Sequence, residues 1–314
     1  MEQDREHEPV RYLESDAEVE REAQVTATLR SPHTIVVYDY GVAPDGTFYY
    51  VMELLDGYSL QTLVTRFGAV PPERAVHILI QACDSLAEAH AAGMVHRDIK
   101  PANLFACRLG NAVDFVKVLD FGLVKTLGLD GHGMEDLTNS DALTGTPAYM
   151  APEVALGTHP VDGQTDLYAL GCVAYWLLTG QKVFPGSKAM QMMIDHARTE
   201  PVPVSLRAPQ PVPEALEEIV MRCLRKDPAE RPATARELAR ELTALGLANA
   251  WSEERAREWW LEHPPTLVER AGDEMAQSDL WISSTPMRPN GGLVSLFRED
   301  EPKGAVWPHQ HVSS

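Results

Sequence analysis

Lysine and glycine are absent from the start of this 314-residue sequence, whose first lysine is Lys100 and whose first glycine is Gly41. A loop that wraps its backbone around phosphate groups needs several glycines. The printed sequence therefore excludes a glycine-rich phosphate loop before Gly41. It also excludes a phosphate-binding lysine before Lys100.

The sequence has few cysteines, and none of them are closely spaced. The four cysteines are scattered, with no C-x-x-C pair: Cys83, Cys107, Cys172 and Cys223. This spacing predicts neither a metal site nor a disulfide framework, and it fits a reducing cytoplasm.

Long hydrophobic runs are also missing. The most apolar run, Leu167 to Gly180, is shorter than the roughly 20 residues that a membrane span needs. We expect a buried helix there and no membrane span. The acidic start, MEQDREHEPVRYLESD, has no apolar stretch and is not typical of a secretory signal.

The sequence has few positively charged residues: it contains 27 Lys and Arg and 46 Asp and Glu, which gives a formal net charge of -19. Nucleic acid and anionic membranes would be repelled by such a surface, so neither is expected as the main partner. A basic or neutral protein partner is favoured. The hydrophobic content of 44% is ordinary for a globular chain with a sizeable core.

The hydrophobic pattern alternates between a few strands and many helices. Helical spacing occurs at 17–30, 59–66, 72–92, 233–245 and 251–263, and helices are expected to resume after Pro152. Strand-like runs at 34–41 and 47–55 flank a turn, which predicts a hairpin, and a second hairpin-like stretch surrounds 96–105 and 115–122. A polar loop covers 127–146, and the composition from Pro264 onward predicts a mostly disordered tail.

The segment HRDIKPAN, residues 96–103, groups three side chains suited to phosphoryl transfer. Asp98 can accept a proton from an attacking hydroxyl, Lys100 can neutralise the phosphoryl group, and Asn103 offers an amide oxygen to a hard metal ion. Taken singly, such residues in a polar loop are usually solvent-exposed or form turns. The spacing, however, matches the pattern H-R-D-L-x-x-x-N with Ile99 in place of leucine.

Two further motifs follow in the expected order. Asp120-Phe121-Gly122 comes directly after the strand-like FVKVL, where its carboxylate could chelate Mg²⁺, and Ala151-Pro152-Glu153 closes the following loop. Three ordered motifs at compatible distances make a chance match improbable.

The chain resembles the bacterial members of the eukaryotic-type serine/threonine protein kinase family over roughly Ala17 to Leu245. The resemblance implies an α+β, protein-kinase-like two-lobe fold. It divides the chain into an acidic segment at 1–16, a kinase domain at 17–246 and a helix with a mostly disordered tail at 247–314. Within the domain, 17–56 is an incomplete N-lobe of helix C and two strands, and 57–246 is a mainly helical C-lobe.

The resemblance also implies an ATP site with Mg²⁺. Glu22 matches the helix C glutamate, Met52 falls at the gatekeeper position, and the backbone of Glu53 and Leu55 would bind the adenine edge. Phe105 resembles the apolar floor under adenine, although an ordinary core aromatic is an equal alternative. Asn103 and Asp120 are the implied metal ligands.

Other residues resemble regulatory and structural positions of the family. By resemblance, Arg97 implies that phosphorylation switches the activity, and Thr138, Ser140 and Thr144 are the candidate acceptors. The resemblance also implies that the guanidinium of Arg97 is buried beside Asp98. Thr146 and Lys100 indicate serine/threonine rather than tyrosine specificity. Asp166 is implied to hold the catalytic-loop backbone, and Arg231 to pair with Glu153.

The family's glycine-rich loop and its lysine strand have no counterpart in this sequence. We expect a fragment of an active kinase, or an active kinase with a misassigned start, and we expect the chain as printed to be weakly active or inactive. The alternative is a catalytically dead regulatory or scaffolding module with a regulatory partner or self-association. A small-molecule phosphotransferase is disfavoured, because the segment GTPAYMAPE is suited to docking a peptide of a protein substrate.

Overall fold

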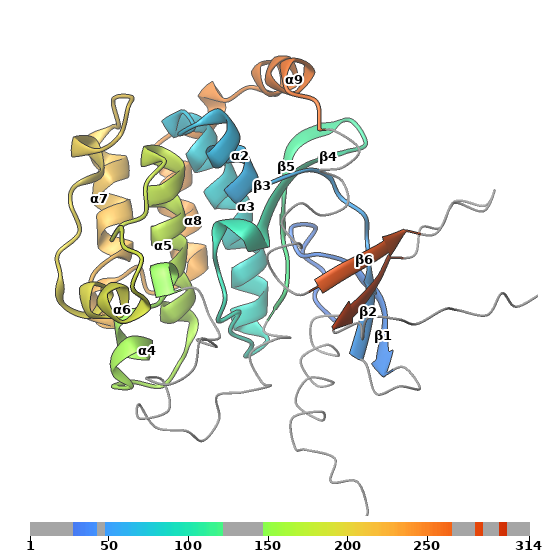
Figure 1. Ribbon diagram of the computed structural model, residues 1–314. Coiled ribbons are helices and arrows are strands. Elements are labelled where there is room, and N and C mark those ends of the chain that lie inside the picture. Colours follow the sequence, from blue (N-terminus) through green and yellow to red (C-terminus); the bar gives the residue numbers. More distant parts are fainter. Residues whose placement is uncertain (1–27, 43–47, 122–146, 266–279, 285–294, 300–314) are drawn as a thin grey trace, which may run out of the picture. The chain divides into compact units, whose positions relative to one another are not determined.

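The structure is a computed structural model that describes residues 28–42, 48–121, 147–265, 280–284 and 295–299 (Figure 1). The chain divides into two compact units, which we describe separately. The first contains the described residues of 1–36 and 55–265, and the second those of 37–54 and 266–314.

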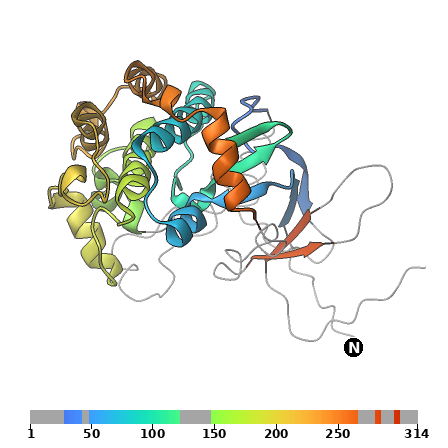
Figure 2. The ribbon, with the colours of Figure 1, turned by 90° about the horizontal axis from the view of Figure 1, so that it is seen from above.

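The first unit is mainly helical (Figures 1 and 2). Its helices are α2 (Leu60–Phe67), α3 (Pro72–Ala91), α4 (Pro152–Leu156), α5 (Gly163–Thr179), α6 (Ala189–Arg198), α7 (Glu214–Cys223), α8 (Ala235–Ala244) and α9 (Glu253–Glu262). Single turns of 3-10 helix lie at η1 (Pro101–Asn103), η4 (Pro147–Tyr149), η5 (Val204–Leu206), η6 (Pro228–Glu230) and η7 (Leu247–Ala250).

Helix α5 is the centre of the core because it is apolar on almost every face. From Thr165 to Tyr175 every side chain is buried. Asp162 caps its N-terminus by accepting from the Gln164 amide, and Gly180 ends it in the left-handed conformation that glycine adopts without strain. The sequence prediction of a buried helix at 167–180 is confirmed.

A three-stranded antiparallel sheet completes this unit, in the order β3 (Asp56–Ser59), β4 (Leu104–Leu109) and β5 (Ala112–Val118). The β4 and β5 pairing confirms the second predicted hairpin. Strand β3 is not predicted by the sequence pattern, because Asp56-Gly57 is typical of a turn. Gly57 is required there: a Cβ on it would lie 2.1 Å from the carbonyl oxygen of Ala106 on β4.

The segment 30–36 is fastened to this sheet and to α3. The backbone of Ile35 donates to Val118 O, and Val118 donates to His33 O. The Glu88 carboxylate on α3 accepts from the amides of Arg30 and Ser31. Most of the predicted helix at 17–30 lies outside the described residues, and its last three residues, 28–30, are not helical.

The second unit contains the predicted first hairpin, in which β1 (Val37–Val42) pairs antiparallel with β2 (Phe48–Met52). It also contains β6 (Leu280–Ser284) and β7 (Ser295–Glu299), an antiparallel pair that the sequence pattern does not indicate. Strand β7 lies beside β2. In the part of the chain that the structure describes, no helix has the length and apolar content to cross a membrane.

Candidate active site

The backbone of residues 96–97 is held by Asp166, a buried residue in the first turn of α5. Its carboxylate accepts from the amide of His96 at 2.8 Å and from the amide of Arg97 at 2.9 Å. A third partner is His90 near the end of α3, whose Nε2 lies 2.8 Å from the same carboxylate. Two helices therefore fix the loop that leads to Asp98.

The loop has an unusual backbone at Arg97, where φ is 66°, and Asp120 has a φ of 52°. Positive φ is uncommon in residues other than glycine, and strain of this kind tends to occur at functional sites. The hydrogen bonds that the amides of His96 and Arg97 donate to Asp166 maintain the conformation at Arg97.

The side chains of Asp98, Lys100 and Asn103 lie together in this loop. Lys100 Nζ is 2.9 Å from Asp98 Oδ2, and Asn103 Nδ2 donates to the same oxygen at 3.1 Å and to the Asp98 carbonyl at 2.9 Å. Asp98 and Lys100 are half-buried, while Asn103 is buried at the end of η1. The carboxylate is thus oriented by a cation on one side and an amide on the other.

Leu119 links this cluster to the end of β5. Its amide donates to Asn103 O at 2.9 Å, and its carbonyl accepts from His96 Nε2 at 2.7 Å. Asp120 follows directly and is half-buried, and Phe121 is buried with its ring 4.6 Å from that of His96. The structure therefore brings the two predicted motifs, at 96–103 and 120–121, to one place.

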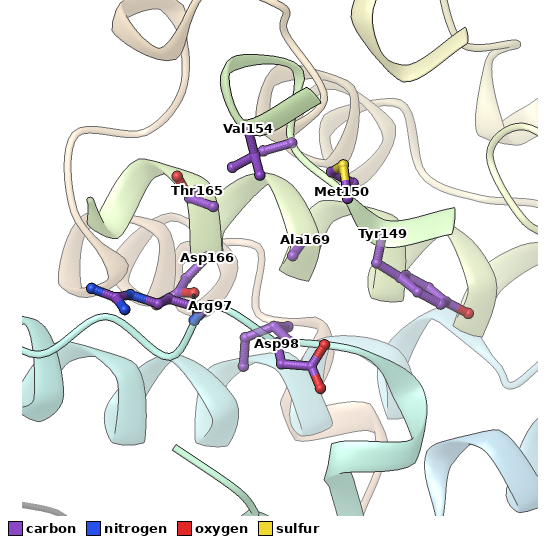
Figure 3. A pocket seen from close by; sticks show the side chains of 10 residues that line it. Arg97, Asp98, Tyr149, Met150, Val154, Thr165, Asp166 and Ala169 are labelled. Atoms are coloured by element: carbon purple, nitrogen blue, oxygen red, sulfur yellow. Dashed lines mark hydrogen bonds between the residues drawn. The ribbon is translucent and has the colours of Figure 1, made fainter. Parts of the chain in front are cut away.

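A small hollow lies between residues 97–99, η4, α4 and α5 (Figure 3). Asp98 lines it from one side, and Tyr149, Met150 and Val154 line it from the other. In Figure 3 the side chain of Arg97 points away from that of Asp98. Arg97 is exposed, so the expectation of a buried guanidinium was wrong. The reason is that the side chain extends toward solvent and does not pack beside Asp98.

The predicted partners Glu153 and Arg231 form a buried bidentate ion pair. Arg231 donates from Nη1 to Oε1 at 2.9 Å and from Nη2 to Oε2 at 2.8 Å, and Thr165 donates to Oε1 at 3.0 Å. Burial raises the pKa of Glu153, but the hydrogen bonds and charge of Arg231 outweigh that effect and hold the pKa below its ordinary value. The pair fixes the start of α4, which lines the hollow.

The remaining predicted residues are divided between the units. Phe105 is half-buried on β4, opposite Ser59 on β3 and Lys117 on β5. Leu55 lies just before β3 in the first unit, whereas Met52 and Glu53 belong to the second. Five predicted residues lie outside the described part of the chain: Glu22, Thr138, Ser140, Thr144 and Thr146.

Two further residues, His90 and Asp114, could not be singled out from the sequence. His90, the third partner of Asp166, sits at a helix C-terminus shortly before His96, which is a weak signal because such a histidine is commonly a solvated cap. Asp114 is a buried carboxylate on β5. No sequence pattern singles out Asp114, since its partners are distant in the chain.

The donor set suits a magnesium nucleotide better than an all-protein metal cage. Among the described residues, no cluster of three His, Cys, Asp or Glu side chains is arranged to hold a metal ion. Asn103 uses its amide nitrogen on Asp98, so its side-chain oxygen remains available to a cation, and Asp120 offers a carboxylate. Mg²⁺ characteristically takes one or two such protein ligands together with substrate phosphates.

The fold and the site define the class of this protein. The protein kinase domain family matches residues 4–242, and the chain belongs to that family. The protein-kinase-like fold, with few N-lobe strands and a mainly helical C-lobe, is confirmed.

Two curated relatives are bacterial. The serine/threonine-protein kinase pkn3 of Myxococcus xanthus is 38% identical over 73% of this chain and 42% of its own length. PknB of Mycolicibacterium smegmatis is 40% identical over 71% of this chain and 35% of its own length. The chain thus spans well under half the length of these relatives.

Two solved structures have the same fold. The kinase domain of Mycobacterium tuberculosis PknI is 26% identical, with a TM-score of 0.54 over 74% of this chain and 79% of that one. Rad53 residues 1-466 in complex with AMP-PNP is 27% identical, with a TM-score of 0.57 over 71% of this chain and 53% of that one. The family prediction made from the sequence is confirmed.

Proposed function

We propose that the protein transfers the γ-phosphate of Mg·ATP to serine and threonine hydroxyls of proteins. The observation that carries the proposal is the cluster of Asp98, Lys100 and Asn103, joined through Leu119 to Asp120. Family membership and relatives named as serine/threonine-protein kinases support it. The comparisons offer no support for the catalytically dead alternative, which rests only on the missing glycine-rich loop and lysine strand.

In this proposal Asp98 is the base that accepts the proton of the substrate hydroxyl. A carboxylate serves this purpose when it is oriented and within hydrogen-bond reach of the hydroxyl. Asn103 provides the orientation by donating to Oδ2. Lys100, which pairs with the same oxygen, supplies positive charge beside the transferred phosphoryl group.

Asn103 and Asp120 would hold Mg²⁺. The family resemblance assigns adenine binding to the backbone of Glu53 and of Leu55, the gatekeeper position to Met52 and the apolar floor under adenine to Phe105. When bound, Mg²⁺ neutralises charge that develops on the phosphate oxygens. Glu22 would serve as the helix C glutamate.

The proposed protein substrate lies along the hollow lined by Tyr149, Met150 and Val154. Thr146 would contact Asp98 and Lys100, consistent with serine/threonine specificity. Arg97 is exposed, so its guanidinium would be accessible to a phosphate group on Thr138, Ser140 or Thr144. We therefore propose that phosphorylation of one of these residues activates the protein. A regulatory partner or self-association would act through that step.

We place this activity in the cytoplasm. Among the described residues all four cysteines are free and buried, which is consistent with a reducing compartment. Phosphorylation of proteins there is a signalling activity.

The test of the function uses the full-length natural protein with radiolabelled Mg·ATP. We expect label in the protein itself or in a basic test protein, and a loss of at least about 1000-fold in Asp98→Asn because the base is removed. Asp84→Asn, which changes an exposed aspartate on α3, is the matched control and should retain activity. Equal labelling by the Asp98 variant would reject Asp98 as the base, and no labelling by the unmodified protein would favour a scaffolding role.

A further inference from the structure

Asp114 on β5 is a fully buried carboxylate outside the active site. Its side chain is 0% exposed, and its φ of 52° is a conformation that aspartate tolerates better than most residues. It lies at the irregularity in the pairing of β4 with β5. A buried charge at a distorted strand position requires several strong partners.

Four N–H groups converge on this one carboxylate. Arg74 on α3 donates from Nε to Oδ2 at 2.9 Å and from Nη2 to Oδ1 at 2.7 Å. The indole of Trp251 donates to Oδ2 and that of Trp260 to Oδ1, both at 2.7 Å. Each carboxylate oxygen therefore receives one guanidinium and one indole bond.

The two tryptophans belong to η7–α9, the segment 247–263, which lies beside the β4–β5 hairpin (Figures 1 and 2). Trp260 is 2% exposed and stacks on Tyr58 of β3 with ring centroids 5.7 Å apart. Trp259 lies under the Arg74 guanidinium, 3.8 Å from ring centroid to Cζ. The segment thus contacts β3, β5 and α3 at once.

Strand β5 connects Asp114 to the catalytic cluster. The strand ends at Val118, and the next residue, Leu119, bonds both Asn103 and His96 through its backbone. Asp120 follows. A shift of β5 therefore moves the groups that orient Asp98 and the proposed metal ligand Asp120.

We propose that Asp114 is a positioning residue for phosphoryl transfer: by binding the indoles of Trp251 and Trp260 it clamps the segment 247–263 onto β5 and fixes the strand end that carries Leu119 and Asp120. This inference rests on the proposed function for its kinetic consequence, but the fixing of β5 can be measured without any activity. Small displacements matter because this kind of catalysis depends on orientation.

The test compares Asp114→Asn and the double variant Trp251→Phe/Trp260→Phe with the unmodified full-length protein. Asparagine tolerates the positive φ, and phenylalanine keeps an aromatic ring while removing the N–H donor. We expect kcat to fall roughly tenfold with KM for ATP and protein changed less than about twofold, because orientation and not binding is lost. Amide hydrogen exchange at 116–121 should rise roughly tenfold in both variants.

Leu261→Ala is the matched control, since Leu261 lies on the same helix but is 81% exposed. It should leave kcat and exchange unchanged. A lower melting temperature with unchanged kcat per folded molecule would reduce Asp114 to a purely structural residue and overturn the proposal. If the unmodified protein transfers no phosphate, the proposed function fails, and unchanged exchange at 116–121 would then overturn the clamp independently.

Discussion

At the residue scale, single carboxylates organise the first unit. Asp166, Glu153 and Asp114 are all buried, and each accepts hydrogen bonds from at least two segments distant in the sequence. A buried charge is tolerated only when it is paired and hydrogen-bonded. Removing one partner from such a group therefore costs far more than breaking a surface ion pair.

Loss of the Glu153–Arg231 pair should destabilise the fold strongly. We expect Glu153→Gln to lower the free energy of unfolding by about 3 to 5 kcal/mol, because Arg231 is left buried without its counter-charge. Urea denaturation measures this change. Arg257→Ala, which breaks an exposed i,i+4 pair with Glu253, is the control and should cost less than about 0.5 kcal/mol. Similar losses in the two variants would contradict the assignment.

His196 should make the stability depend on pH. It is buried on α6 beside the Tyr168 hydroxyl, with Lys226 donating to its carbonyl and Asp195 next to it. Burial, reinforced by the charge of Lys226, lowers the pKa of His196 to about 4 from 6.5. The folded state therefore binds fewer protons than the unfolded state between these values, and stability falls as the pH drops below about 6.5.

The difference between the pKa of His196 in the unfolded and folded states corresponds to about 3 kcal/mol in the free energy of unfolding. Most of this stability is lost as the pH falls from 6.5 to 4. Denaturation midpoints of the unmodified protein and of His196→Gln, measured from pH 7.5 to 4.5, test this. Glutamine does not titrate, so the variant should have the shallower slope. Parallel curves would show that His196 is not the group responsible.

Contacts between elements decide which helix substitutions are tolerated. Gly171 on α5 faces α7, and a Cβ on it would lie 2.6 Å from the Cβ of Cys223. Alanine normally stabilises a helix by about 1 kcal/mol relative to glycine. Overpacking in a core costs about 1 to 3 kcal/mol. The steric cost of the added Cβ should therefore exceed the gain in helix propensity.

Gly171→Ala is therefore expected to lower the melting temperature. Gly186→Ala is the control, because its Cβ would make only an ordinary 3.4 Å contact with Met192. A melting temperature above that of the unmodified protein would show that α5 and α7 can separate at no cost.

Elements with strong periodicity could be predicted from the sequence. Helices α3, α5, α8 and α9 and the hairpins β1–β2 and β4–β5 lie where the pattern indicates. Strand β3 could not be found, because four residues around Asp56-Gly57 are too few for a period and their pairing with β4 is a tertiary contact. In the candidate site the motif residues were predictable by spacing, whereas His90 and Asp114 act only through partners that folding brings near.

Charge is a property of the whole molecule, and the net value of -19 should influence substrate encounter. Such a surface attracts basic proteins at low ionic strength, and salt screens the attraction. We expect kcat/KM for a basic test protein to fall several-fold between about 50 and 300 mM salt. A neutral peptide substrate is the control and should show little change. Equal salt dependence for both would indicate that the surface charge does not steer the substrate.

The tryptophan bonds to Asp114 also bear on where the first unit can be truncated. The family match ends at residue 242, but Trp251 and Trp260 lie beyond it. A recombinant fragment designed from the family boundary would leave the Arg74–Asp114 pair with half of its hydrogen bonds and would expose the ring of Tyr58. A stable recombinant fragment of the first unit should therefore extend past His263, whose carbonyl accepts a hydrogen bond from the Tyr58 hydroxyl.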